Sequence, residues 1–164
     1  MPLAFTYPLM KRFTYWPQLF LGITFNYGLI LGWTTIYGEI NIEPIIFYFG
    51  AIFWTLGYDT IYGFQDIKDD EIIGVKSTSI KFKNSPKQFI FISYLLFSMS
   101  LIIIGILMKF SYIYFITLII PLSHLFYYQV YNLNMKDYIC LKIFKSNNLL
   151  GLTILICLMI GKTI

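Results

Sequence analysis

The sequence predicts an all-α protein, a polytopic transmembrane helix bundle with about five spans. Of its 164 residues, 58% are hydrophobic and 12% are charged, whereas a soluble domain carries about 25% charged residues. The apolar residues form runs of about 20 residues, the length at which a helix crosses a bilayer core. The runs cover residues 18–37, 44–64, 88–108, 111–130 and 147–163.

Two connections between these runs are very short, at residues 38–43 and 109–111. A chain that leaves the bilayer and re-enters it over so few residues has to reverse its direction. We therefore expect the runs on either side of each connection to form antiparallel helical hairpins.

The basic residues predict an orientation in the membrane. Lys109 and Lys162 fall on one side of the predicted bundle, and the other ten Lys and Arg residues fall on the opposite side. The positive-inside rule places the richer side in the cytoplasm or the mitochondrial matrix. This asymmetry accounts for the net charge of +4, and nothing in it indicates nucleic-acid binding. The ten residues are Lys11, Arg12, Lys68, Lys76, Lys81, Lys83, Lys87, Lys136, Lys142 and Lys145.

The acidic residues concentrate in segment 58–78, YDTIYGFQDIKDDEIIGVKST, at the end of the second run. It holds five of the eight, namely Asp59, Asp66, Asp69, Asp70 and Glu71. Carboxylates at a membrane surface are costly to desolvate and usually serve ions, substrates or proton transfer. A channel or transport protein that binds cations is one interpretation of this pattern.

A second interpretation is a metal–diphosphate site. If the helix continues through the acidic segment, Asp59, Asp66 and Asp70 share one face, with Tyr62 beside them. Mg²⁺ prefers such oxygen ligands and is often bound by one or two carboxylates plus phosphate oxygens. Lysines such as Lys76 follow closely, and cations beside carboxylates suit a metal–diphosphate better than a lone cation.

Other polar residues carry two interpretations each. Lys11 and Arg12 either set the topology or contact an anionic head group. Ser77 lies in a segment that is either a plain loop or a donor of hydroxyl and amide groups to phosphate. Asn147 and Asn148 are either good residues to begin the last helix or site residues. Three further residues are expected to have structural roles only: Cys140 in a loop, Cys157 inside the last span, and His124 in the core.

Three segments resemble the UbiA superfamily of intramembrane aromatic prenyltransferases, in the order and at the spacing of that family. They are YPLMKRFTYWPQ (7–18), YDTIYGFQDIKDDEIIGVKSTSIKF (58–82) and CLKIFKSNNLLGL (140–152). The second resembles the DxxxD motif of the family, here Asp66 to Asp70 with Asp59 upstream. The nearest branch is the 4-hydroxybenzoate polyprenyltransferases of ubiquinone biosynthesis.

The resemblance implies an enzyme that moves a polyprenyl group from its diphosphate to an aromatic acceptor such as 4-hydroxybenzoate. Asp59, Asp66 and Asp70 would be the catalytic residues and would hold Mg²⁺. The location would be a bacterial or mitochondrial inner membrane, with the lipid bilayer around the prenyl tail. The substrate-binding residues would be Lys11, Arg12, Tyr62, Lys76, Ser77, Asn147 and Asn148.

The resemblance covers only part of such an enzyme. Members of the family have about nine spans and a first motif of the type NDxxDxxxD, and no Asn-Asp pair occurs in this sequence. Residues 1–164 then form a partial domain, the C-terminal half with the second aspartate motif. We expect no activity from it alone. A separate N-terminal half could complete a split enzyme, or the chain could be a decayed gene fragment.

Overall fold

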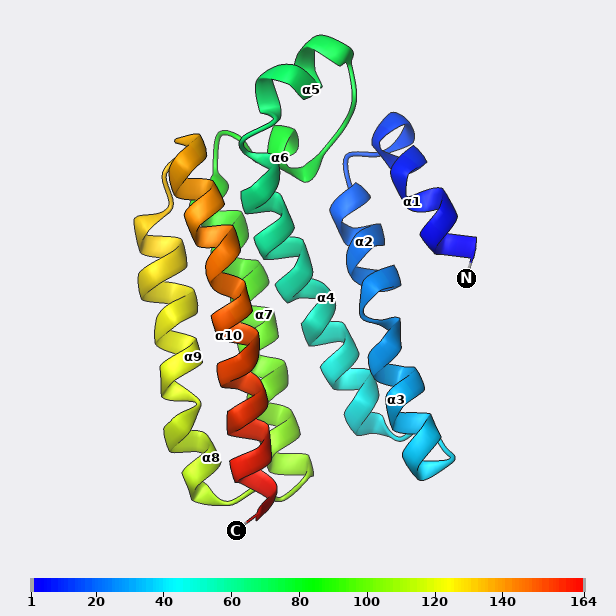
Figure 1. Cartoon of the computed structure of the whole chain (residues 1–164), viewed down its shortest axis with the longest axis vertical. Helices are drawn as coiled ribbons and strands as arrows, with labels where there is room; N and C mark the ends of the chain where they lie inside the picture. The colour runs from blue at the N-terminus through cyan, green and yellow to red at the C-terminus, as the bar shows by residue number, and fades with distance from the viewer. Residues whose placement is uncertain (1, 164) are drawn as a thin grey trace.

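The structure, a computed structural model, describes residues 2–163, with side chains for residue 6 and residues 9–162. Within that part of the chain all regular structure is helical, as the sequence predicts (Figure 1). The helices are α1 (Pro2–Phe13), α2 (Pro17–Phe25), α3 (Tyr27–Tyr37), α4 (Ile42–Gly63), α5 (Ile67–Ile73), α6 (Thr78–Lys81), α7 (Pro86–Leu107), α8 (Tyr112–Thr117), α9 (Ile119–Ser123), the π-helix η1 (His124–Tyr131) and α10 (Asp137–Thr163).

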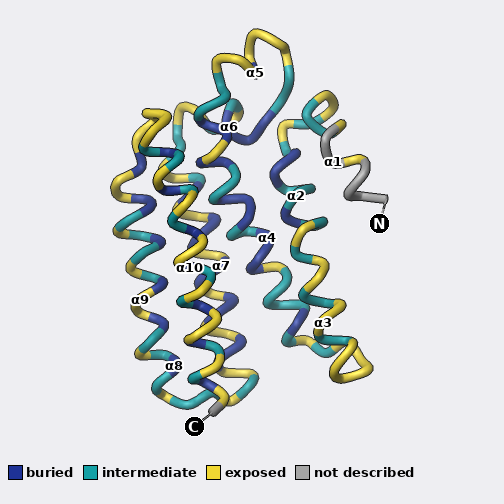
Figure 2. Tube along the Cα trace, in the orientation of Figure 1, coloured by how far each residue is buried: buried dark blue, intermediate teal, exposed yellow. Residues whose placement is uncertain are grey.

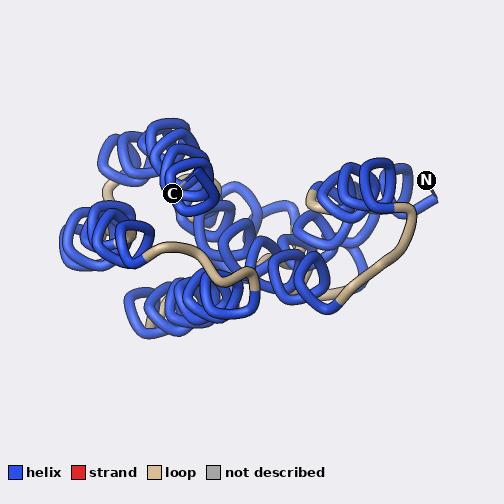
Figure 3. Tube along the Cα trace, turned by 90° about the horizontal axis from the view of Figure 1, so that it is seen from below, coloured by secondary structure: helices blue, strands red, loops and turns tan. Residues whose placement is uncertain are grey.

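Helix α4 occupies the middle of the bundle. It packs most extensively against α7, and it also contacts α2, α3 and α10. Helices α1, α2 and α3 lie on one side of α4, and α8, α9 and α10 lie on the other (Figure 1), and the view from below shows the two ends of the chain on opposite sides of the molecule (Figure 3). The elements that bracket the acidic segment therefore belong to the best-packed part of the molecule.

The core lies between α4, α7, the α8–η1 segment and α10 (Figure 2). Tyr94, Phe97, Leu101 and Tyr114 are fully buried there. On α10, a row of inward-facing residues recurs every three or four positions, which is the spacing of one helix face. That row consists of Cys140, Ile143, Asn147, Leu150, Ile154 and Cys157.

Four helical segments are long and apolar enough to cross a membrane: Pro17–Tyr37, Pro86–Leu107, Tyr112–Tyr131 and Asp137–Lys162. They match four of the five predicted spans. The remaining prediction, 44–64, is a helix of the expected length, α4 with 22 residues. It is not among the four because Asp59, together with several tyrosine, tryptophan, threonine and glycine residues, lowers its mean hydropathy. It is also the helix with the most protein around it.

The last span begins ten residues earlier than predicted. Helix α10 starts at Asp137, so Asn147 and Asn148 lie inside it and do not begin it. Cys140 is buried on this helix and does not lie in a loop. Lys142 and Lys145 gave the appearance of a loop in the sequence, but both are on the exposed face of α10.

The fourth span is not a regular α-helix. Pro121, in α9, has no N–H to donate, and three residues later the chain continues as the π-helix η1. The wider turn places Gln129, in η1, inside the core with none of its surface exposed. His124 stacks on Tyr128 and approaches the side-chain amide of Gln129 at 3.4 Å.

Both predicted hairpin turns are present. Gly38 ends α3 with φ of 76°, a backbone conformation that suits glycine, and α4 begins at Ile42. Lys109, with φ of 54°, lies in the turn between α7 and α8. These turns and the end of α10 lie at one end of the bundle, whereas α5, α6 and the start of α10 lie at the other (Figure 1).

Candidate functional site

The acidic segment is divided between two helices. Helix α4 ends at Gly63, residues 64–66 turn, and α5 begins at Ile67. The expectation that Asp59, Asp66 and Asp70 share the face of one continuous helix is therefore wrong. At Gly63 α6 approaches α4 directly, because a Cβ there would collide with the Ser79 hydroxyl.

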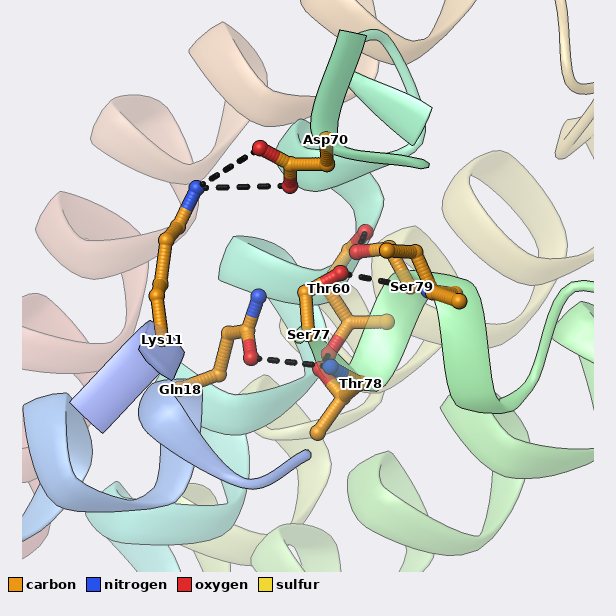
Figure 4. A network of polar contacts seen from close by, with 8 residues as sticks. Lys11, Gln18, Thr60, Asp70, Ser77, Thr78 and Ser79 are labelled. Carbon is orange, nitrogen blue, oxygen red and sulfur yellow. Dashed lines mark hydrogen bonds and ion pairs between the residues drawn. The ribbon is translucent and has the colours of Figure 1, made fainter. Parts of the chain in front are cut away.

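Asp70 forms the ion pair that joins the N-terminal helix to the acidic segment. Its two carboxylate oxygens each lie 3.3 Å from Nζ of Lys11, at the end of α1 (Figure 4). Asp70 is buried, with 7% of its surface exposed. A buried carboxylate needs a counter-charge, and here the counter-charge comes from the segment 59 residues away in sequence.

Asp59 and Asp66 are influenced by the charge of the same lysine. Asp59 is within electrostatic range of both Lys11 and Asp66. Asp66 interacts with Asp70, Lys11 and Asp137, the first residue of α10. Partial burial, followed by the neighbouring Asp70 carboxylate, raises the pKa of Asp66, and Lys11 opposes that rise. The three predicted carboxylates are thus within electrostatic range of the same lysine, and Asp70 is in contact with it.

Within residues 2–163, no three His, Cys, Asp or Glu side chains come close enough to one another to form a metal site from protein groups alone. A cage of three carboxylates is therefore not what the acidic segment forms. What it forms is a cluster in which one carboxylate is paired with a lysine and the others repel each other.

The segment after Gly74 is bound to the N-terminal helices by its backbone. The N–H of Lys76 donates to the carbonyl oxygen of Lys11 at 2.7 Å. Nζ of Lys76 reaches the carbonyl of Phe13 at 3.5 Å and lies 5.5 Å from the centre of the Tyr15 ring. Arg12 is exposed and makes no ion pair with any residue that the structure describes. Its guanidinium is available at this end of the bundle.

Three consecutive hydroxyl residues, Ser77, Thr78 and Ser79, are fully buried beneath the acidic cluster (Figure 4). The Ser77 hydroxyl accepts the N–H of Ile80 and so caps α6. The Thr78 hydroxyl shares a 2.6 Å hydrogen bond with that of Thr60. The Ser79 hydroxyl donates to the carbonyl of Thr60 at 2.9 Å.

Gln18, at the start of α2, completes this arrangement. Its Oε1 accepts the backbone N–H of Thr78 at 3.0 Å, and the side chain is 4% exposed. Together with Thr60 it fixes α2, α4 and α6 relative to one another. Sequence reasoning assigned no role to Gln18, Thr60 or Asp137. The signal for Gln18 was a polar residue directly after Pro17, inside an otherwise apolar run.

The third segment that resembles the family, residues 140–152, lies in α10, and its polar contacts are inside the bundle. Asn147 is buried, and its Oδ1 accepts from Nε1 of Trp54 at 2.9 Å and from Nε2 of Gln129 at 3.1 Å. Gln129 in turn accepts from the Tyr94 hydroxyl at 2.5 Å. Asn147 therefore connects α10 to α4 and η1, and through Gln129 to α7.

An aromatic-lined cavity of about 250 Å³ lies beside Asn147, between the α2–α3 junction, α4 and α10. Asn148 is exposed and lines it. Tyr62 is 41% exposed and packs its ring 4.8 Å from that of Phe144, one of the cavity residues. The lining residues are Phe25, Asn26, Trp54, Thr55, Tyr58, Phe144, Asn147 and Asn148.

The fold and the site define a helical integral-membrane protein with a cluster of carboxylates and lysines at one end of its bundle. The chain belongs to the UbiA prenyltransferase family, whose family model matches residues 1–149. This confirms the family that the three sequence segments indicated.

Its similarity extends to named enzymes. The chain is 41% identical to the mitochondrial 4-hydroxybenzoate polyprenyltransferase of Bos taurus over 163 residues, which is 97% of the chain and 43% of that enzyme. Its identity to the human enzyme of the same name is 40%, with the same coverage. The enzyme of Arabidopsis thaliana is 52% identical over 86 residues, 52% of the chain and 21% of the enzyme. No solved structure matches significantly.

The chain spans less than half the length of the bovine and human relatives that it matches. It corresponds to the C-terminal part of that enzyme, as the sequence predicted.

Proposed function

We propose that this chain is the C-terminal part of an intramembrane 4-hydroxybenzoate polyprenyltransferase of ubiquinone biosynthesis. The reaction would transfer a polyprenyl group from its diphosphate to the aromatic ring. The observation that carries the proposal is the ion pair between Lys11 and Asp70. It brings the cationic segment 7–18 against the acidic segment 58–82, so cations and carboxylates for a metal–diphosphate share one end of the bundle.

The residues present fit Mg²⁺ in the company of a diphosphate. Asp59, Asp66 and Asp70 supply hard oxygen donors, and Mg²⁺ is usually held by only one or two carboxylates when phosphate oxygens complete its shell. The mutual repulsion of Asp66 and Asp70 would be relieved by a bound cation. When bound, Mg²⁺ supplies a positive charge that stabilises the departing diphosphate.

The chain's own residues would do the rest. Arg12 and Lys76 provide cations for the diphosphate oxygens, and Lys11 holds Asp70 in place until the substrate arrives. Tyr58, Tyr62 and Phe144 offer ring faces, and such faces attract an allylic cation by about 0.5–2 kcal/mol each when well placed. The 250 Å³ cavity that they flank could accept an aromatic ring, and Asn148 adds a polar group at its wall.

We propose that the chain alone is inactive. Losing even one donor to a developing negative charge costs about 10²–10³ in rate, and the relatives' remaining length would supply the first aspartate motif and the acceptor's carboxylate site. The test is the chain in lipid with polyprenyl diphosphate, 4-hydroxybenzoate and Mg²⁺, with and without a co-expressed N-terminal part. Prenylated product that forms only when both parts are co-expressed supports a split enzyme. Product from the chain alone contradicts its inactivity, and none from either favours a decayed gene.

In the complemented enzyme, Asp66→Asn and Asp70→Asn should each abolish turnover, because each removes a charge that we assign to Mg²⁺ binding. Asp69→Asn is the matched control: it makes the same chemical change in the same helix, at an exposed residue, and should keep most of the activity. The turnover of each variant is measured as prenylated product formed per amount of enzyme. Full activity of both of the first two variants would remove the role assigned to this cluster.

We also propose that the end with α5 and α6 faces the cytoplasm or the mitochondrial matrix, because ten of the twelve basic residues gather there. Cysteines introduced as Lys83→Cys and Asn41→Cys should react with impermeant reagents from opposite sides of the membrane. Labelling of both from one side would contradict this orientation.

A further inference from the structure

The Trp54 side chain of α4 is held in place by the two helices beside it, α7 and α10. Its Nε1–H donates to Oδ1 of Asn147 at 2.9 Å. Its ring stacks on that of Phe97, with the ring centres 5.2 Å apart and the planes within 7° of parallel. Gly151, one turn after Asn147, leaves room for the ring, because a Cβ there would lie 3.3 Å from Cη2 of Trp54. A hydrogen bond, a stacking contact and a close approach thus fix the position of this ring.

The amide of Asn147 presents its oxygen, and not its nitrogen, to Trp54. Its Nδ2 donates to the backbone carbonyls of Ile143 and Phe144 at 3.2 and 3.1 Å. Oδ1 is therefore left to accept from Trp54 and from Nε2 of Gln129, the latter at 3.1 Å. The indole N–H is a donor only, so Trp54 keeps this bond only while Oδ1 faces it.

Gln129 fixes that orientation from outside the cavity. It belongs to η1, has none of its surface exposed, and is not among the residues that line the 250 Å³ cavity. Its Oε1 accepts the Tyr94 hydroxyl at 2.5 Å, which leaves Nε2 to donate to Asn147. With the amide of Gln129 reversed, two oxygens would face each other. Tyr94, Gln129 and Asn147 therefore form a buried relay of hydrogen bonds that ends on Trp54.

Trp54 is also a wall of the 250 Å³ cavity. It is half-buried, and its ring meets that of Tyr58 edge-on, with centres 5.8 Å apart. The Tyr58 ring lies 5.9 Å from that of Phe144, which lines the cavity too. A cavity of about 150 Å³ is enough for a benzene ring, so this cavity accommodates one ring with its substituents. Tyr58 directly precedes Asp59, so the cavity and the acidic cluster share one part of α4.

We propose that Trp54 is the specificity-determining wall of this cavity. Asn147, Gln129 and Tyr94 are positioning residues that act through it. The inference rests on the proposed function, in which the cavity receives the aromatic ring of the acceptor. An indole held by a hydrogen bond and by stacking moves aside only at a cost, because protein interiors are closely packed. The site therefore accepts a single hydroxylated benzene ring and rejects a fused two-ring acceptor, which needs the space of the indole.

The test uses the chain co-expressed with an N-terminal part taken from the human relative and purified with it in lipid nanodiscs. Equilibrium binding is measured for 4-hydroxybenzoate and for its two-ring analogue 6-hydroxy-2-naphthoate, and prenyl transfer to each is measured afterwards. The unchanged protein should bind the one-ring acceptor about tenfold more tightly or better. Trp54→Ala should bring the ratio of the two affinities close to one, because it removes the wall. Trp54→Phe should lower that ratio about threefold, because a smaller ring remains against Phe97.

Two equally buried tyrosines test the positioning role. Tyr94→Phe removes the hydroxyl that orients Gln129. Tyr114→Phe is the matched control, because it makes the same change at a residue that is also 0% exposed, but whose hydroxyl donates to the carbonyl of Leu101, outside the relay. Both variants should lower the unfolding midpoint to a similar extent. Only Tyr94→Phe should lower the affinity ratio, by about threefold, and equal ratios in the two variants would overturn the positioning role.

The binding ratio separates this inference from the proposed activity. A ratio that is unchanged in Trp54→Ala and Trp54→Phe overturns the inference, even if prenyl transfer proceeds normally. So does equal binding of the two acceptors, or binding of neither, by the unchanged protein. A ratio that depends on Trp54 without any prenyl transfer upholds the wall while the proposed activity fails. If circular dichroism shows that Trp54→Ala does not fold, the ratio of Trp54→Phe decides.

Discussion

Helix α7 and the segment Pro17–Tyr37, which contains α3, are both long and apolar enough to cross a membrane, but they are packed very differently. In α7, half of the most apolar part is buried, and Tyr94, Phe97 and Leu101 have no exposed surface. In α3 no residue is buried, and Ile36 is 78% exposed. The comparison shows that enough hydropathy to cross a bilayer does not predict how many protein neighbours a helix has.

The strongest way to break this comparison is to truncate one side chain in each region. Tyr94→Ala should lower the free energy of unfolding by about 3–5 kcal/mol, because it leaves a cavity where an aromatic ring was packed and strands the amide oxygen of Gln129. Ile36→Ala should change it by less than about 0.5 kcal/mol. Denaturant titrations in detergent, followed by circular dichroism, measure both. Equal losses would show that α3 is packed as tightly as α7.

A second prediction sharpens the comparison within α10, where Asn147 and Asn148 are adjacent. Asn147→Leu should cost about 1–3 kcal/mol, since it leaves the N–H groups of Trp54 and Gln129 without their acceptor. Asn148→Leu, the same change at an exposed position, should cost less than about 0.5 kcal/mol. The same titrations apply. A larger loss for Asn148 would contradict the structural role of Asn147 as the link between α10, α4 and η1.

The smallest expected effect concerns charge at the acidic end. The pKa of Asp66 is raised in part by the Asp70 carboxylate and lowered by Lys11. Asp70→Asn removes the repulsion and releases Lys11 from its ion pair, so the pKa of Asp66 should fall toward its ordinary value. Carboxyl carbon-13 NMR titration without metal measures the change. Asp69→Asn also removes a carboxylate, but one with less influence on Asp66, and should shift the pKa less. An unchanged or higher pKa after Asp70→Asn would contradict the clustering.

The helical architecture was predictable because apolar runs of span length have few alternatives in a bilayer. Two predictions were wrong: the start of the last span and the continuation of the second helix through the acidic segment. Lys142 and Lys145 suggested a loop, although a helix readily carries such residues on an exposed face while Cys140 and Ile143 point inward. The helix does not continue through the acidic segment, because α4 ends at Gly63, where α6 lies close to it.

In the candidate site, residue types were predictable but their partners were not. A lysine, a row of carboxylates and a Lys-Ser-Thr segment are visible in the sequence, and they lie at one end of the bundle. That Lys11 pairs with Asp70, or that Gln18 accepts the N–H of Thr78, depends on contacts about 60 residues apart, which local patterns do not encode. Asn147 illustrates the same limit, since its hydrogen bonds to Trp54 and Gln129 join residues that are 93 and 18 positions away in the sequence.

The two buried cysteines of α10 can report local opening of this helix. Cys140 is 0% and Cys157 is 4% exposed, and they lie near opposite ends of the same helix. A thiol reacts only when it is reached by the reagent, so each modification rate reports how often its end of α10 opens. With Cys140→Ser and Cys157→Ser as single-thiol variants, the opening of the two ends of α10 can be timed separately.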